Sequence, residues 1–187
     1  MLQNLFVYGT LMRAAAECRL GRSERARLEA AGEWLGLARI NGCLYDLGAY
    51  PVVVAPPAEV ATLANDTTVH GEVFRLRAPA MTFRWLDIYE GISPGKTTGT
   101  EYTRAIAKVH LDDGDQIEAW VYRNIGPIGR ARHIPNGRWR PQETHRKKCE
   151  ALPPCARRLA ALCRGAAAPI GSSQLSSQPA KKAPCPP

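Results

Sequence analysis

The sequence lacks the motifs of several large enzyme classes and has no segment suited to crossing a membrane. The one Gly-x-Ser-x-Gly match, 91–95 (Gly-Ile-Ser-Pro-Gly), follows an expected helix and lies in an expected loop, so it lacks the strand–turn–helix context of the serine hydrolases. None of the six cysteines forms a Cys-x-x-Cys pair, and the four histidines share no metal-ligand spacing with them. The apolar runs are too short for a membrane span, and no basic flank marks a secretory signal. We therefore expect a cytoplasmic protein with reduced thiols that uses no metal or other cofactor and does not bind a membrane.

Acidic residues are scarce in the last third of the chain. The formal net charge of +8 arises after position 123: residues 1–123 hold 13 Lys and Arg against 15 Asp and Glu, whereas residues 124–187 hold 12 against 2. Ten of the 15 prolines also follow position 123. We therefore predict one domain over residues 1–140 and a basic, Pro/Ala/Ser-rich tail over residues 141–187. Such a tail can bury little apolar surface, so we expect it to be largely disordered, with at most a short helix at 155–164.

Within the first domain, apolar periodicity predicts many strands and few helices. Helices are expected at 12–31, with a break at Gly21, and at 81–90, where Gly91 ends the helix. Strands are expected at 6–8, 34–47 (two strands, or one bent strand, around a tight turn at 41–42), 52–55, 67–77, 102–111 and 116–122, the last two joined by a hairpin turn at 112–115. His70, Glu72, Arg75 and Arg77 are expected on the polar face of their strand. This order favours an α+β fold with a curled sheet or small barrel.

The stretch 6–11, Phe-Val-Tyr-Gly-Thr-Leu, predicts a strand, a glycine turn and the start of a helix. Thr10 is a favourable N-cap, and good helix formers follow from Met12 onward. That geometry leaves several backbone N–H groups pointing in one direction, where they can hold an anion or a developing oxyanion. The alternative is an ordinary strand–helix connection through a glycine, and this segment alone leaves the two interpretations open.

Glu90 is the candidate for acid–base chemistry. It ends the helix predicted at 81–90, where the helix dipole is negative and a carboxylate is disfavoured by roughly 0.3–1 kcal/mol. That position raises the pKa of the carboxyl group, more so in a dry site, toward the value that a general base needs near neutral pH. The alternative is a solvated surface glutamate just before a C-cap glycine.

Six short motifs occur in order along residues 5–123. They are 6–11 (Phe-Val-Tyr-Gly-Thr-Leu), 42–51 (Gly-Cys-Leu-Tyr-Asp-Leu-Gly-Ala-Tyr-Pro), 69–74 (Val-His-Gly-Glu-Val-Phe), 86–91 (Leu-Asp-Ile-Tyr-Glu-Gly), 102–104 (Tyr-Thr-Arg) and 119–122 (Ala-Trp-Val-Tyr). Together they resemble the γ-glutamylcyclotransferase-like superfamily, including its γ-glutamylamine cyclotransferase and AIG2-like branches. Residues 134–139, Ile-Pro-Asn-Gly-Arg-Trp, are similar to the closing Ile-Pro-x-Gly-x-Trp segment of that family.

The resemblance implies a fold and an activity. The fold is a small mixed β-barrel with flanking helices. The implied enzyme cyclises the γ-glutamyl group of a small γ-glutamyl compound to 5-oxoproline and releases the amine. Glu90 falls on the catalytic glutamate of the family, acting as base and then as acid.

The resemblance also implies a set of substrate-binding residues. It places the substrate-binding loop at Tyr8, Gly9, Thr10 and Leu11. Tyr50 and Tyr102 are expected beside the substrate as wall or hydrogen-bonding groups. Arg104 is expected either to orient the substrate or, alternatively, to pair with a neighbouring acid on an adjacent element.

A binding module is the rival function. In that interpretation the barrel is catalytically silent, and the basic tail contacts an acidic partner or nucleic acid through charge neutralisation. No aromatic residue beyond Trp139 interleaves the basic clusters of the tail, which argues against specific recognition of nucleic acid, so we do not expect a nucleic-acid partner. The enzyme hypothesis predicts that deletion of 141–187 is tolerated and that Glu90→Gln is not. The leaving amine is not specified by the sequence, and we expect the loop at 92–99 to select it.

Overall fold

The computed structural model describes residues 2–56 and 67–141 of the 187-residue chain. In chain order the elements are β1 (Asn4–Val7), the 3-10 helix η1 (Arg13–Ala15), α1 (Arg22–Ala31), β2 (Gly32–Asn41), β3 (Cys43–Asp46), β4 (Pro51–Val54), β5 (Thr68–Leu76), α2 (Pro79–Tyr89), β6 (Tyr102–Leu111), β7 (Gln116–Asn124) and β8 (Arg132–His133). Residues 142–187 lie outside the described part, so the predicted tail and its short helix stay predictions.

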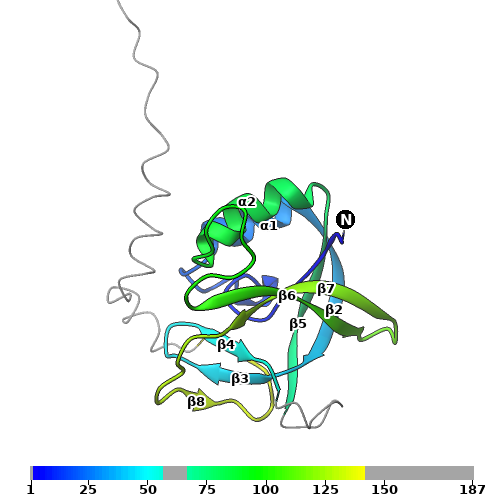
Figure 1. Cartoon of the computed structure of the whole chain (residues 1–187). Coiled ribbons are helices and arrows are strands. Elements are labelled where there is room, and N and C mark those ends of the chain that lie inside the picture. Colours follow the sequence, from blue (N-terminus) through cyan, green and yellow to red (C-terminus); the bar gives the residue numbers. More distant parts are fainter. Residues whose placement is uncertain (1, 57–66, 142–187) are drawn as a thin grey trace, which may run out of the picture.

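Five strands close into a barrel in the order β1-β5-β2-β6-β7 (Figure 1). Neighbouring strands are antiparallel except β1 and β7, which run parallel where Leu5 pairs with Trp120. Apolar side chains alternate into the core, as on β6, where Ala107 and Val109 are buried and Lys108 between them is exposed. The predicted α+β fold with a small mixed β-barrel is therefore confirmed.

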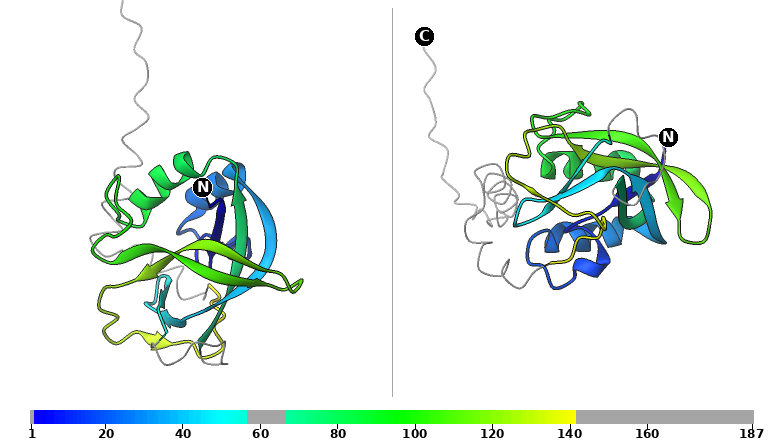
Figure 2. Two further views of the ribbon diagram at one scale, coloured as in Figure 1. Left: turned by 45° about the vertical axis from the view of Figure 1, so that its right-hand side comes forward. Right: turned by 90° about the horizontal axis from the view of Figure 1, so that it is seen from below.

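A second sheet, in the order β4-β3-β8, lies at the end of the barrel opposite the two α-helices (Figures 1 and 2). The two strands predicted around 41–42 form, and they do not pair with each other: β2 belongs to the barrel and β3 to the second sheet. The Gly42 N–H donates to the Thr67 carbonyl at 2.7 Å, and a Cβ at Gly42 would lie 2.9 Å from Val53 Cγ1. Close approach between the sheets therefore explains this glycine.

Helices α1 and α2 pack against each other beside the barrel. The Arg27 guanidinium of α1 lies over the Trp85 ring of α2, 4.5 Å from its centroid. Pro79 occupies the first turn of α2, where its missing N–H is not needed. Gly91 ends the helix in the left-handed conformation at φ 75°, as predicted. Within residues 2–56 and 67–141, no helix combines the length and the apolar character that a membrane crossing requires.

The first predicted helix is wrong in its first half. Thr10 is not an N-cap: after β1 the chain forms only the three-residue η1, which has Met12 at its N-cap, and α1 begins at Arg22. The predicted break at Gly21 is confirmed, since this residue precedes α1 with φ 71°. The buried Arg25 guanidinium donates to the carbonyls of Thr10 and Cys18. Tertiary hydrogen bonds therefore hold this stretch in a loop despite its helix-forming composition.

Candidate active site

Glu90 lies at the C-terminus of α2, as predicted. The Glu90 N–H donates a helical hydrogen bond to the Leu86 carbonyl at 2.9 Å, and the Gly91 N–H donates to the Ile88 carbonyl at 3.1 Å. The side chain is only partly exposed. Burial, and then the negative charge of Asp87, raise the pKa of Glu90 from its ordinary 4.5 to about 8. The carboxyl group can therefore change protonation state near neutral pH.

The charge of this carboxyl group acts on several tyrosine side chains. Burial raises the pKa of Tyr8, Tyr102 and Tyr122, and the negative charge of Glu90 raises each of them further, which places Glu90 near all three phenols. The Tyr8 hydroxyl donates to the Tyr122 carbonyl at 2.7 Å. Tyr50 is close enough to Tyr102 to raise its pKa as well. Tyr8, Tyr50, Tyr102 and Glu90, which the sequence analysis selects from separate parts of the chain, are therefore linked electrostatically, Tyr50 through Tyr102.

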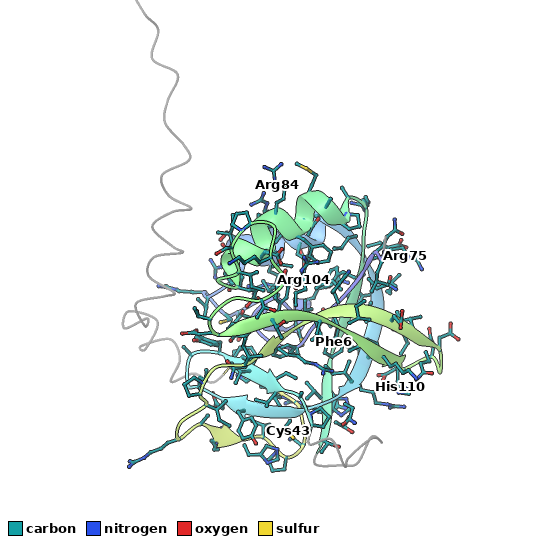
Figure 3. All side chains as sticks on the ribbon, viewed as in Figure 1. Phe6, Cys43, Arg75, Arg84, Arg104 and His110 are labelled. Atoms are coloured by element: carbon teal, nitrogen blue, oxygen red, sulfur yellow. The ribbon has the colours of Figure 1, made fainter. Side chains whose placement is uncertain are left out.

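Asp87, one helical turn before Glu90, is held from two sides. The Tyr122 hydroxyl donates to Asp87 Oδ1 at 2.6 Å, and Arg104 approaches the same carboxylate with Nε at 2.9 Å from Oδ1 and a terminal nitrogen at 3.2 Å from Oδ2. The Arg104 guanidinium also lies over the rings of Phe83 and Trp120, at 4.1 and 4.7 Å from their centroids, beneath α2 (Figure 3). This arrangement matches the alternative interpretation of Arg104, pairing with a neighbouring acid.

Residues Tyr8, Gly9, Thr10 and Leu11 form the buried loop that leaves β1. The Met12 N–H donates to the Gly9 carbonyl at 3.0 Å, closing a turn. The Thr10 side chain is close enough to the Tyr89 hydroxyl to lower the pKa of that phenol, against the larger effects of burial and Glu90. Within residues 2–56 and 67–141, the N–H groups of Gly9, Thr10 and Leu11 have no hydrogen-bond partner. These backbone donors are therefore not used by the described part of the chain.

Glu72 is a site neighbour that the sequence reasoning missed. It is 3% exposed, and its two carboxylate oxygens accept the N–H groups of Arg13 at 2.9 Å and Ala14 at 3.1 Å. Donors further along the loop are thus already occupied by the protein's own carboxylate. The sequence places Glu72 on the polar face of its strand. Only the register of β5 against β1, in which Glu72 lies opposite Val7, shows that Glu72 is next to the loop that follows β1.

Arg123 is the second residue that the sequence reasoning missed. It lies on β7, immediately after Tyr122, and is partly buried. One terminal nitrogen donates to the Asn41 carbonyl at 3.5 Å, and Nε is buried without a hydrogen-bond partner. Its positive charge lowers the pKa of Tyr8, against the larger effects of burial and Glu90. The sequence signal that could have identified Arg123 is a basic residue on the same face of its strand as the buried Ala119 and Val121.

Several solved structures are similar to this chain. An AIG2-like protein from Mus musculus has a TM-score of 0.51 at 17% identity, covering 76% of this chain and 97% of the mouse protein. YkqA from Bacillus subtilis has a TM-score of 0.47 at 22% identity over 74% of this chain, which spans only 40% of the bacterial protein. A γ-glutamyl cyclotransferase has a TM-score of 0.44 at 13% identity, with 94% of each chain covered. Curated proteins give no significant match.

The comparison with protein families gives a match to one family model. The model for γ-glutamyl cyclotransferase, AIG2-like, matches residues 5–141, which is most of the chain and nearly all of its described part. Family and fold together indicate γ-glutamyl cyclotransferase-like activity. The chain therefore belongs to the γ-glutamyl cyclotransferase, AIG2-like family.

Proposed function

We propose that this protein cyclises the γ-glutamyl group of a small γ-glutamyl compound to 5-oxoproline and releases the amine, with Glu90 as the acid–base catalyst. The observation that carries the proposal is a partly buried carboxyl group with a pKa of about 8, grouped with the phenols of Tyr8 and Tyr102. Tyr8 belongs to the same loop as the unpaired N–H groups of Gly9, Thr10 and Leu11. The site thus combines a base with hydrogen-bond donors.

In the proposed reaction the γ-carbonyl oxygen of the substrate accepts hydrogen bonds from these backbone N–H groups. The α-amino nitrogen attacks the γ-carbonyl carbon, and Glu90 takes the proton that this nitrogen loses. The new carbon–nitrogen bond closes a five-membered lactam, and the negative charge on the oxygen is stabilised by the loop. The bond to the leaving nitrogen then breaks, and Glu90 returns the proton to the released amine.

A single acid–base residue is sufficient for this chemistry because nucleophile and electrophile belong to one molecule. Well-oriented intramolecular reactions reach effective molarities of about 10⁵–10⁸ M, so holding the substrate in a folded conformation supplies much of the acceleration. A carboxyl group with a pKa of about 8 can both accept and return a proton near neutral pH. No nucleophilic side chain of the protein takes part in the proposed steps.

The remaining site residues have supporting roles in this proposal. Tyr50 and Tyr102 line the substrate, and their phenol groups can hydrogen-bond with its polar atoms. Arg104 acts through Asp87: its guanidinium fixes the carboxylate that lies one turn from Glu90 and raises the pKa of the base. Arg104 is therefore a positioning residue in the proposed mechanism.

The test is incubation of the purified protein with a panel of γ-glutamyl amino acids and γ-glutamyl amines, with detection of 5-oxoproline. We expect release from at least one compound, and a loss of about 10²–10⁴-fold in kcat for Glu90→Gln, the usual contribution of a general base. Glu118→Gln, at an exposed position of β7, is the matched control. Turnover by Glu90→Gln at the wild-type rate would exclude Glu90 as the base.

A further inference from the structure

We propose that Arg123 binds the α-carboxylate of the substrate and makes the enzyme selective for γ-glutamyl compounds in which that carboxylate is free. The inference rests on the proposed function and assigns the part of the substrate that the backbone donors of the loop do not hold.

Arg123 is a partly buried cation without an anion. Within the described residues it takes part in no salt bridge, and its one hydrogen bond, to the Asn41 carbonyl, is long at 3.5 Å. Its Nε–H is buried and unpaired. Burial of an unpaired charge or donor is costly, and a bound carboxylate would remove that cost by accepting from the guanidinium. A guanidinium presents its N–H groups as a planar fork that suits a carboxylate.

The position of Arg123 links it to the site. The Tyr8 hydroxyl donates to the carbonyl of Tyr122, the residue that directly precedes Arg123. Burial and the negative charge of Glu90 raise the pKa of Tyr8, whereas the positive charge of Arg123 lowers it. Both charges therefore act on the same phenol. A ligand beside Tyr8 can meet Glu90 with its amino group and Arg123 with its carboxylate.

The other arginine of the site is already neutralised. Arg104 pairs with Asp87 and lies over the rings of Phe83 and Trp120, so its charge is satisfied within the protein. Arg84, on the outer face of α2, points away from the site (Figure 3). Of Arg84, Arg104 and Arg123, it is therefore Arg123 that offers the uncompensated positive charge that an anionic substrate group requires.

This assignment divides the two oxygen-bearing groups of the substrate between two sets of donors. The α-carboxylate binds to Arg123, and the γ-carbonyl oxygen binds to the N–H groups of Gly9, Thr10 and Leu11. The backbone donors are then reserved for the oxygen on which charge develops during ring closure. The α-amino group is attached to the same carbon as the carboxylate, so Arg123 also sets its distance from Glu90.

The experiment compares Arg123→Gln, Arg123→Lys and the control Arg84→Gln in the full-length protein. Kinetics use the γ-glutamyl compound that the wild type turns over best, together with its α-carboxamide analogue. Binding is measured by calorimetric titration with 5-oxoproline and with 5-oxoprolinamide, which lacks the carboxylate. Circular dichroism and denaturant unfolding check that each variant is folded.

For the carboxylate substrate we expect Arg123→Gln to raise KM by about 10- to 100-fold, as for loss of a charge-assisted hydrogen bond, with a smaller effect on kcat. The affinity for 5-oxoproline should fall by a similar factor, while the carboxamide ligands are unaffected. Arg123→Lys keeps the charge but loses the planar fork, so it should lie between the wild type and Arg123→Gln. Arg84→Gln should match the wild type.

Equal losses with carboxylate and carboxamide ligands would overturn the proposal, because a purely structural role produces that result. A wild-type protein that binds both ligands equally would also overturn it. If Arg123→Gln does not fold, Arg123→Lys is the variant that tests the proposal. An unchanged ratio of the affinities for 5-oxoproline and 5-oxoprolinamide in Arg123→Lys contradicts the proposal. Absence of 5-oxoproline release from every compound contradicts the proposed function instead, and the binding comparison still decides the role of Arg123.

Discussion

Glu90 owes its unusual acidity to two features of its surroundings. Burial is the larger cause of its raised pKa, and the negative charge of Asp87 is the second. Asp87 cannot turn away from Glu90, because the Tyr122 hydroxyl and the Arg104 guanidinium both hold its carboxylate. The protonation state of the proposed base is therefore coupled to a small buried network.

Asp87→Asn should shift the pH dependence of the enzyme. In the wild type, kcat/KM should rise with pH as Glu90 loses its proton, with a midpoint of about 8. Removing the negative charge of Asp87 favours ionised Glu90, and the unpaired Arg104 charge acts in the same direction, so the midpoint should move to lower pH. The measurement is kcat/KM for 5-oxoproline release across pH 5–10. The control is Asp115→Asn, at an exposed position, whose midpoint should match that of the wild type. A midpoint in Asp87→Asn that equals or exceeds the wild-type value would contradict this account.

The sequence predicts some single residues of the site well and others not at all. Glu90 is predictable because its signals are local: an amphipathic helix and a glycine that ends it. Glu72 and Arg123 are not, because each looks like an ordinary charged residue of a strand. Their partners are set by strand register, Val7 opposite Glu72 and Thr103 opposite Arg123, and register is a property of the assembled sheet.

At the scale of elements, local sequence signals predict correctly those turns and helix ends that depend on residues close together in the chain. The turn at 112–115 joins β6 and β7 as predicted, and α2 ends at the predicted glycine. They fail after β1, where the buried Glu72 and Arg25 hydrogen-bond the backbone of the loop and keep it out of a helix. Helix propensity amounts to only about 1 kcal/mol per residue or less, so such tertiary bonds override it.

Gly9→Ala should disturb the substrate-binding loop. A Cβ at Gly9 would lie 2.7 Å from Cγ and 3.0 Å from Cδ of Pro51 in β4, so the loop must move away from that strand. We expect a stability loss of about 1–3 kcal/mol and a fall in kcat/KM of about 10- to 100-fold, since small displacements of positioning groups are costly. Gly126→Ala is the control, because its Cβ would meet nothing closer than 3.4 Å. Equal activity of the two variants would show that the loop tolerates the displacement.

At the scale of the whole molecule, the uneven charge distribution separates the family domain from the basic tail. The family match ends at residue 141, and Trp139 is buried at 5% exposure. The boundary after residue 140 and the disorder of the tail stay predictions, since residues 142–187 lie outside the described part. Composition could suggest such a boundary, but it could not supply the strand order of the barrel or the grouping of its tyrosines, which depend on contacts between distant segments.

Deletion of residues 141–187 should leave the enzyme active. The proposed site uses residues from Tyr8 to Arg123, so we expect kcat/KM and the unfolding midpoint of the shortened protein to remain near those of the full chain. The measurement is 5-oxoproline release together with denaturant unfolding. Loss of turnover in a folded, shortened protein would assign the tail a part in catalysis. A full chain that releases no 5-oxoproline but binds acidic polymers through the tail would favour the binding-module function.

The parallel pairing of β1 with β7 has a consequence for the order of assembly during synthesis. Leu5, on the first strand of this domain to be synthesised, pairs with Trp120, on the last strand of the barrel. The barrel therefore cannot close until almost the entire domain has been translated, and the nascent chain must keep an apolar N-terminal segment unpaired on that side until then. Folding of this domain should accordingly be slow and should complete only after release of β7 from the exit tunnel.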